Sequence, residues 1–271
     1  MIGDVVGDPG LDVLDRRLPL LIKEKSADFV IVNGENAAGG FGITGPCLER
    51  IFAAGADVVT GGNHIWEKRE FWPFLNTEKR ILRPLNYPES PGSGWVKLEK
   101  PSLWGETPIT WLAVNLQGRE FMNPIDCPFR TFDTLEYQIE NPDPLGDKLP
   151  IENPIILVDF HAESSREKEA LAYYLDGRVS VVAGTHTHVQ TADERLLPKG
   201  TAYITDLGMT GVLDGIIGMD TKICLDRARN QVLYRMEVSA PEAEGKTSVQ
   251  GIIAEIGGDS RKAISIKRFS I

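Results

Sequence analysis

Four histidines occur in the 271-residue sequence, and each follows an apolar run that predicts a buried strand. His64 comes after VVTGGN, His161 closes IILVDFH, and His186 and His188 follow VSVVAG. Carboxylates and carboxamides follow similar runs elsewhere. In an open α/β sheet the carboxyl ends of the strands form a ligand-binding crevice, so these side chains are expected to meet there. The candidates are Asp4, Glu35, Asn36, Asn63, His161, His186 and His188.

This donor set indicates a metal site. It combines imidazole nitrogens with carboxylate and carboxamide oxygens and contains no thiolate. Such donors suit iron, manganese or zinc, with Mg(II) also allowed, and they do not choose among these metals. Seven candidates are too many for one tetrahedral ion. They suit two divalent or mixed-valence metal ions that share a bridging carboxylate.

Two residue pairs with i, i+2 spacing add detail. On an extended strand such residues share one face, so His186 and His188 are expected to point at one metal region. Asp159 and His161 have the same spacing. Asp159 is therefore expected to orient His161 from behind rather than bind metal. The alternative for Asp159 is a solvated residue at the sheet edge.

Alternating helix-like and strand-like segments predict an α/β fold, in one domain spanning residues 1–271. Helices are expected over 11–25, from Pro46 onward, and over 165–175, where Ser164 and Glu167 form a capping-box pattern. Residues 84–108 hold five of the 17 prolines and are expected to form a long loop. The expected strands are 29–33, 57–60, 109–116, 154–160, 179–183 and 201–205, with a hairpin over 250–256 and 263–269.

Composition limits the function. A net charge of −10 argues against an extended nucleic-acid surface, which needs basic stripes, but it allows a small phosphate ligand held by metals. The sequence shows neither an apolar run long enough to span a membrane nor a signal-peptide pattern. Three widely spaced cysteines predict no disulfide framework. We expect a cytoplasmic protein, and homo-oligomerisation stays open.

Longer motifs carry a family resemblance. GD near residue 4, GENAAGG at 34–40, GNH at 62–64, DFHAE at 159–163 and GTHTH at 184–188 resemble the calcineurin-like metallophosphoesterases. More narrowly, the chain resembles the bacterial YmdB family of phosphodiesterases. The motifs that extend this likeness over nearly the whole chain are RPLNYP (83–88), CPFRT (127–131), LDGRV (175–179), HVQTADERLLP (188–198) and TAYITDLGMTG (201–211).

The resemblance implies a four-layer αββα sandwich of the metallo-dependent phosphatase type. It also implies hydrolysis of small phosphodiesters, 2',3'-cyclic nucleotides such as 2',3'-cAMP among them. The seven candidate residues become the ligands of two metals, with Glu35 bridging, and His64 becomes the catalytic histidine. A hydroxide that bridges the metals would attack phosphorus, while protonated His64 stabilises charge or protonates the leaving oxygen.

Substrate contacts are expected from the turn after strand 29–33. Gly39 and Gly40 let the backbone come close to the substrate, and the helix start at Thr44 offers amide donors to an anion. A plain surface turn is the alternative. Arg130 and Arg195 are candidate contacts to phosphate or base, with surface salt bridges as the alternative for both.

Three departures separate this sequence from the general metallophosphoesterase pattern, and one of them is the motif GEN in place of the usual bridging carboxylate after GD. Asp4 is followed by Val5 and Val6, so the early histidine ligand of an Asp-x-His motif is absent. Ile65 replaces the common acidic residue after GNH, and Glu67 is the candidate to substitute for it.

Other functions remain open. One is a regulatory protein that binds a nucleotide or partner with little turnover, and another is a phosphomonoesterase. A metal hydrolase of the amidohydrolase type is disfavoured, because its HxH pair comes early in the chain and here it comes late.

Overall fold

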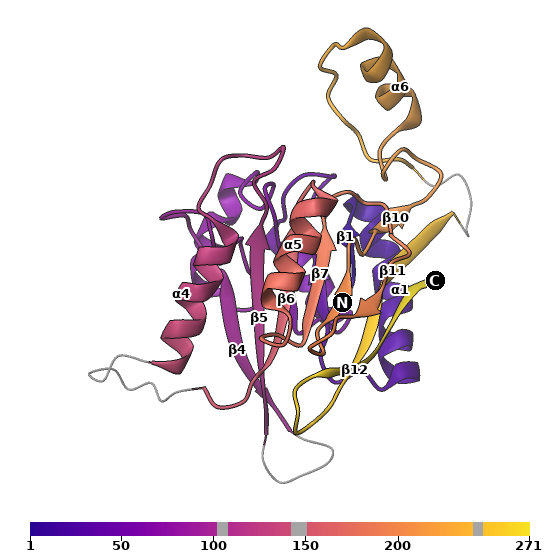
Figure 1. Ribbon diagram of the computed structural model, residues 1–271. Coiled ribbons are helices and arrows are strands. Elements are labelled where there is room, and N and C mark those ends of the chain that lie inside the picture. The colour runs from indigo at the N-terminus through magenta and orange to yellow at the C-terminus, as the bar shows by residue number, and fades with distance from the viewer. Residues whose placement is uncertain (102–107, 142–150, 241–245) are drawn as a thin grey trace.

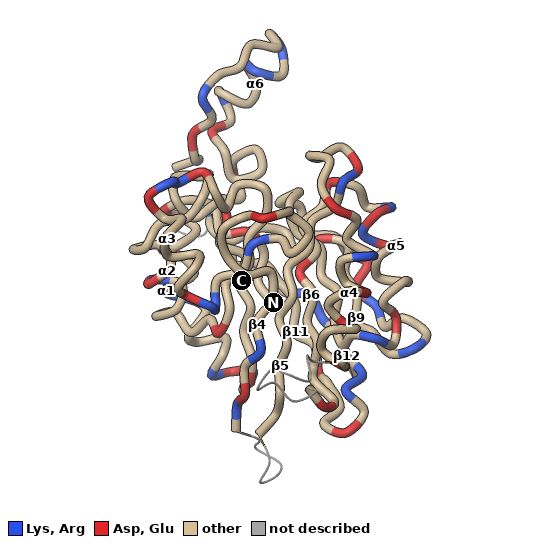
Figure 2. The backbone as a smooth tube through the Cα atoms, turned by 90° about the vertical axis from the view of Figure 1, so that its left-hand side faces the viewer, with Lys and Arg blue, Asp and Glu red and all other residues tan. Residues whose placement is uncertain are grey.

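Two β-sheets stack face to face between two layers of helices (Figure 1). This computed structural model describes residues 1–101, 108–141, 151–240 and 246–271. In the view of Figure 2, α1 (Gly7–Lys25), α2 (Gly45–Ala53) and α3 (Trp72–Thr77) lie on one side of the strands. The helices α4 (Pro128–Glu140) and α5 (Ser165–Leu175) lie on the other side.

The first sheet has the strand order β1-β10-β11-β12 and is extended by a parallel pair, β2 and β3. Ile2 joins the two parts, because it bridges Val32 on one side and Gly251 on the other. The hairpin predicted near the end of the chain is confirmed as the antiparallel pair β11–β12. The strands are β1 (Asp4–Val5), β2 (Ile31–Asn33), β3 (Val58–Thr60), β10 (Met209–Val212), β11 (Thr247–Ile256) and β12 (Ala263–Ser270).

The second sheet has the order β4-β5-β6-β7-β9-β8. Its four inner strands run parallel, and the edge strands β4 and β8 are antiparallel to their neighbours. The strands are β4 (Trp95–Lys100), β5 (Ile109–Gln117), β6 (Ile155–His161), β7 (Val181–Thr185), β8 (Arg195–Leu196) and β9 (Ala202–Ile204).

Helix formation follows local sequence signals. In α1 the residues Leu11, Leu14, Leu18 and Leu21 form one buried face, as their spacing predicts. The capping prediction for α5 is confirmed, because the Ser164 side chain accepts a hydrogen bond from the backbone N–H of Glu167. A short 3-10 helix (Arg69–Phe71) precedes α3, and α6 (Thr221–Asn230) projects from the body (Figure 1). Among the described residues, no helix is long and apolar enough to cross a membrane.

Three apolar clusters fill the three spaces between the four layers. Leu14 and Ile51 pack α1 and α2 on the first sheet, and Phe132 and Leu171 pack α4 and α5 on the second. The two sheets meet through a cluster that contains Leu157. The remaining members between the sheets include Ile31, Val58, Trp111, Ala113, Ile155, Val181, Ile204 and Ile252. The fold prediction of a four-layer αββα sandwich is thereby confirmed.

The prediction of a long loop over 84–108 is wrong in part, because β4 lies within this range. Its residues Trp95–Lys100 pair along their whole length with β5. Prolines flank this strand without interrupting it, so the high proline content of this segment does not exclude a strand. The sequence patterns also missed α3, α4, α6, β8 and β10.

The cluster between the sheets is expected to dominate stability. Leu157→Ala should lower the free energy of unfolding of metal-free protein by about 2–5 kcal/mol, because the cavity left between two sheets cannot collapse. The same change at exposed Leu20 should cost less than about 0.5 kcal/mol. Urea unfolding of both variants measures the difference. Equal effects would contradict the assignment of Leu157 to the core.

Candidate metal centre

The alternation of side chains along β6 aims polar groups at the space between the sheets. Leu157 belongs to the cluster between the sheets, whereas Val158 and Phe160 pack against α4 and α5. With a period of two, Asp159 and His161 share the face of Leu157, and they lie at the carboxyl end of the strand. Both are buried there, facing the ends of β2 and β3.

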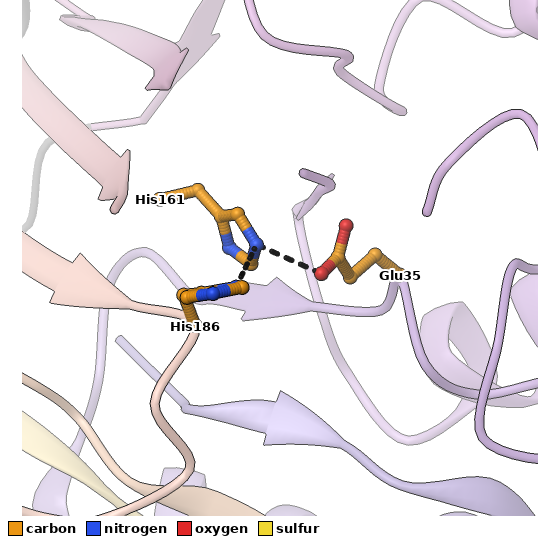
Figure 3. Close-up of side chains that lie close together, drawn as sticks. All are labelled: Glu35, His161 and His186. Carbon is orange, nitrogen blue, oxygen red and sulfur yellow. Dashed lines mark hydrogen bonds and ion pairs between the residues drawn. The ribbon is translucent and has the colours of Figure 1, made fainter. Parts of the chain in front are cut away.

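His161 meets Glu35 and His186 at this point (Figure 3). Its Nε2 lies 2.9 Å from Glu35 Oε1, 3.0 Å from His186 Nδ1 and 3.1 Å from Asn63 Oδ1. One ring nitrogen carries at most one proton and cannot satisfy three partners. Four donor atoms that converge in this way suit a shared cation.

A second group of candidates lies beside the first. Asp4 Oδ1 and Asn36 Oδ1 are buried, and neither has a hydrogen-bond partner among the described residues. His188 Nε2 lies 3.9 Å from Asp4 Oδ1. His188 Nδ1 lies 2.9 Å from the carbonyl oxygen of Ile217, an arrangement that holds the proton on Nδ1 and leaves Nε2 as an electron-pair donor. Unpaired buried oxygens are costly, so their presence here also fits a cation.

Glu35 is placed by the turn after β2. Its backbone N–H donates to Asn33 Oδ1 at 3.2 Å, and its Oε2 accepts the backbone N–H of His64 at 2.9 Å. Gly62 permits this closeness, because a Cβ atom there would lie 2.3 Å from the His161 ring and 2.5 Å from Glu35 Oε2. Asn33, to which the sequence assigned no role, thus positions Glu35.

The expected extended geometry of the HxH pair is wrong. Strand β7 ends at Thr185, and His186 and His188 follow it with φ angles of 101° and 63°. These residues do not share a strand face, and instead the turn between them directs both rings to the centre. Asp206 Oδ2 holds this turn by accepting the backbone N–H of Thr187 at 3.2 Å and its hydroxyl at 2.8 Å.

Lys168 and Asp206 form a fully buried ion pair behind the turn. Lys168 Nζ donates to Asp206 Oδ2 at 2.7 Å, and both side chains are only 1% exposed. Two sequence signals point to this pair. Lys168 lies on the buried face of α5 with Leu171 and Leu175, where a lysine is unusual. Asp206 directly follows the strand expected at 201–205, so it is one more strand-end carboxylate.

Asp159 is buried rather than solvated, which removes the alternative of an exposed edge residue. It accepts hydrogen bonds from Asn33 Nδ2 at 3.2 Å, from the Thr60 hydroxyl, and from the Thr185 hydroxyl at 2.7 Å. The same Thr185 oxygen lies 3.0 Å from His161 Nδ1. The influence of Asp159 on the His161 ring therefore passes through Thr185, another residue that the sequence analysis missed.

Burial and close charges shift the pKa values at the centre. Burial raises the pKa of Asp4 to about 6. Burial would also raise the pKa of Glu35, but attraction to His161 and hydrogen bonding lower it to about 2. Burial and repulsion by His161 lower the pKa of His186 to about 3. Burial opposes protonation of His161, yet Glu35 raises its pKa to about 9, so His161 must lose a proton to act as a ligand.

His64 follows Asn63 directly and is partly exposed, whereas Glu35 and His161 are buried. Its Nδ1 is 3.3 Å from Glu67 Oε1, so the candidate substitute for the missing acidic neighbour lies within reach of the ring. The ring also meets Phe41 edge-on, with 5.0 Å between the ring centres. The backbone N–H of His64 binds Glu35, which couples the position of His64 to the cluster.

The other candidates for substrate contact divide into two groups. Gly39, Gly40 and Thr44 lie in the turn that carries Glu35, with φ of 67° at Gly39 and 90° at Gly40. A Cβ at Gly39 would meet nothing within 4 Å, whereas at Gly40 it would lie 3.0 Å from Val238 and 3.1 Å from Met219. Gly39 therefore lies at an open position, and a side chain at Gly40 would crowd two neighbouring side chains.

The two arginine candidates come from α4 and from the edge strand β8. Arg130 is exposed on α4, on the outer face of the second sheet. Arg195 pairs with Glu169 and with Asp193, the latter at 3.3 Å, which agrees with the salt-bridge alternative.

The fold and the converging donors together place this protein in the class of metallo-dependent phosphatases. The structure resembles a novel phosphatase from Mycoplasma pneumoniae with a TM-score of 0.86 and 30% identity, covering 100% of this chain and 91% of that chain. It also resembles a hypothetical protein from Thermus thermophilus, with a TM-score of 0.85 and 38% identity over 100% of this chain and 97% of the other.

Sequence comparison then identifies the family. The YmdB-like protein family matches residues 1–269, and the chain belongs to this family. It is 44% identical over 273 aligned residues to the 2',3'-cyclic-nucleotide 2'-phosphodiesterase of Bacillus subtilis, covering 100% of this chain and 95% of that protein.

Removing the buried lysine should disturb the turn that carries two candidate ligands. Lys168→Met leaves Asp206 buried without its cationic partner, which should cost about 3–5 kcal/mol of unfolding free energy. Arg166→Met, two residues earlier on α5, breaks an exposed pair with Glu120 and should cost less than about 1 kcal/mol. Chemical denaturation measures both, and similar costs would contradict the structural role of Lys168.

Asp4→Asn should have opposite effects with and without metal. Without metal it should raise the free energy of unfolding by about 1–3 kcal/mol, because it removes a poorly compensated buried charge. With Mn(II) or Zn(II) added, the stabilisation by metal seen in the unaltered protein should be lost. Thermal unfolding with each ion measures this, and exposed Asp28→Asn is the matched control. Unchanged stabilisation by metal would remove Asp4 from the ligand set.

Proposed function

We propose that this protein is a metal-dependent phosphodiesterase that hydrolyses 2',3'-cyclic nucleotides such as 2',3'-cAMP. The observation that carries the proposal is the convergence of buried Glu35 and His161 with the partly exposed His186, where the backbone N–H of His64 also bonds Glu35. The name of the Bacillus subtilis relative supports the substrate class, since the likeness extends over the whole chain.

Two metal ions are proposed, divalent or mixed-valence, with iron, manganese, zinc or magnesium as the candidates. One group of ligands comprises Asn63, His161 and His186, and the other comprises Asp4, Asn36 and His188. Glu35 is proposed to serve both groups. When bound, such ions polarise a phosphoryl oxygen and lower the pKa of a bound water toward neutrality.

The residues of this chain supply positioning and proton transfer. Glu67 fixes the Nδ1 proton of His64, so in the protonated ring Nε2 carries the proton available to substrate. His64 is proposed to stabilise developing charge or to protonate the leaving ribose oxygen. Gly39 lies in the turn that begins at Glu35, and a Cβ atom at this position would meet no other atom within 4 Å, so this part of the turn is open to a substrate. The start of α2 at Thr44 supplies amide donors near an anion.

Loss of His64 should separate metal binding from turnover. In metal-loaded protein, His64→Ala should lower kcat for 2',3'-cAMP by about 10²–10⁴-fold, the usual contribution of a general acid. Its metal content should match that of the unaltered protein, because its side chain is not among the proposed ligands. Steady-state kinetics and elemental analysis on the same samples measure both quantities. Full activity in the variant would remove His64 from this role.

The same assay distinguishes the competing functions. Faster turnover of a simple phosphomonoester than of 2',3'-cAMP or bis-p-nitrophenyl phosphate would identify a phosphomonoesterase. Absence of turnover with all three, in protein of full metal content, would favour a regulatory protein that binds nucleotide. Glu70→Ala is a suitable control, because Glu70 is exposed and lies just beyond the loop that carries His64.

A further inference from the structure

A cavity lies at the amino-terminal ends of strands of the six-stranded sheet, whereas the metal centre lies at their carboxyl ends. Its volume is about 270 Å³, and it is bordered by the second half of α4, the amino-terminal end of β6 at Ile156, and the β11–β12 turn. His161, at the other end of β6, belongs to the metal centre. The floor is apolar and includes Phe132, Leu135 and Ile139.

Arg261 lines this cavity and has hydrogen-bond donors without a partner among the described residues. Its Nε and Nη1 atoms are buried, and neither has a hydrogen-bond partner among the residues that the structure describes. Buried guanidinium donors are costly when they are left unpaired. By contrast Arg178, which also lines the cavity, is fully engaged, since it bonds Asp133 at 2.7 Å and Glu136 at 2.5 Å.

The backbone holds Arg261 in a conformation that its side chain disfavours. Its φ is 57°, in the left-handed region that suits glycine. Two hydrogen bonds fix it there, from its N–H to Gly257 O at 2.9 Å and from the Ser180 hydroxyl to its carbonyl oxygen at 2.6 Å. One left-handed backbone conformation is common in a hairpin loop, and these hydrogen bonds hold it in place. Here it accompanies an arginine whose donors are unused.

We propose that this cavity binds a small organic anion, with a carboxylate or phosphate head at Arg261 and a compact apolar body against Phe132 and Ile139. The charges of the described lining agree with an anion. Glu136 is neutralised by Arg178, Glu140 and Lys262 are exposed at the rim, and the partly buried Arg261 has two buried nitrogens without a partner among the described residues. The proposal goes beyond the phosphodiesterase activity and does not depend on it.

Binding of benzoate and of phenyl phosphate to metal-free protein tests the proposal, with neutral benzamide as the reference. Ligand-detected NMR titration should show saturable binding of at least one anion, with a Kd in the millimolar range, and none of benzamide. The anion that binds more tightly identifies the preferred head group. Because metal is removed, the result does not depend on whether the proposed phosphodiesterase activity is correct.

Arg261→Gly is the decisive variant, because glycine adopts the left-handed backbone without strain while the guanidinium is lost. We expect the Kd to rise at least about tenfold, with no fall in melting temperature. Lys267→Met, which removes an exposed cation from β12 of the same hairpin, should leave the Kd unchanged. Three results would overturn the proposal: no binding of either anion, equal binding by Arg261→Gly, or a large loss of its stability.

Discussion

The buried carboxylate of Asp159 ties the two sheets together at the point where the metal centre forms. It lies on β6 of the second sheet and accepts hydrogen bonds from Asn33 and Thr60, at the ends of β2 and β3 in the first sheet. A third bond comes from Thr185 at the end of β7. A buried carboxylate is stable only when it is well hydrogen-bonded, so these contacts restrict how the sheets sit against each other.

That restriction is what brings the donors together. Glu35 and Asn63 follow strands of the first sheet, whereas His161 and His186 come from the second. Shifting one sheet against the other would break the 2.9 Å contact between His161 and Glu35, and the cluster would no longer exist. The apolar cluster between the sheets and the Asp159 network thus have related roles. The first supplies the energy of association, and the second specifies the alignment.

Charge at the centre is balanced by two successive groups of charged residues. His161 and Glu35 stabilise each other's ionised forms, while Asp4 lies nearby with its pKa raised by burial. Behind them, Lys168 neutralises Asp206, which in turn holds the turn between His186 and His188. The local positive φ of both histidines is thereby supported from outside the cluster. Such an arrangement leaves the donors fixed before a ligand arrives, which favours binding.

The sequence by itself determined the α/β alternation, most strands and the grouping of polar residues at their carboxyl ends, because these follow from periodicity and from the geometry of parallel sheets. The four-layer arrangement came from the family resemblance. Only the tertiary structure decided the shape of the His186–His188 turn, the path from Asp159 through Thr185 to His161, and the roles of Asn33 and Lys168. Those features depend on hydrogen bonds between residues far apart in the chain, and local sequence patterns do not predict such contacts.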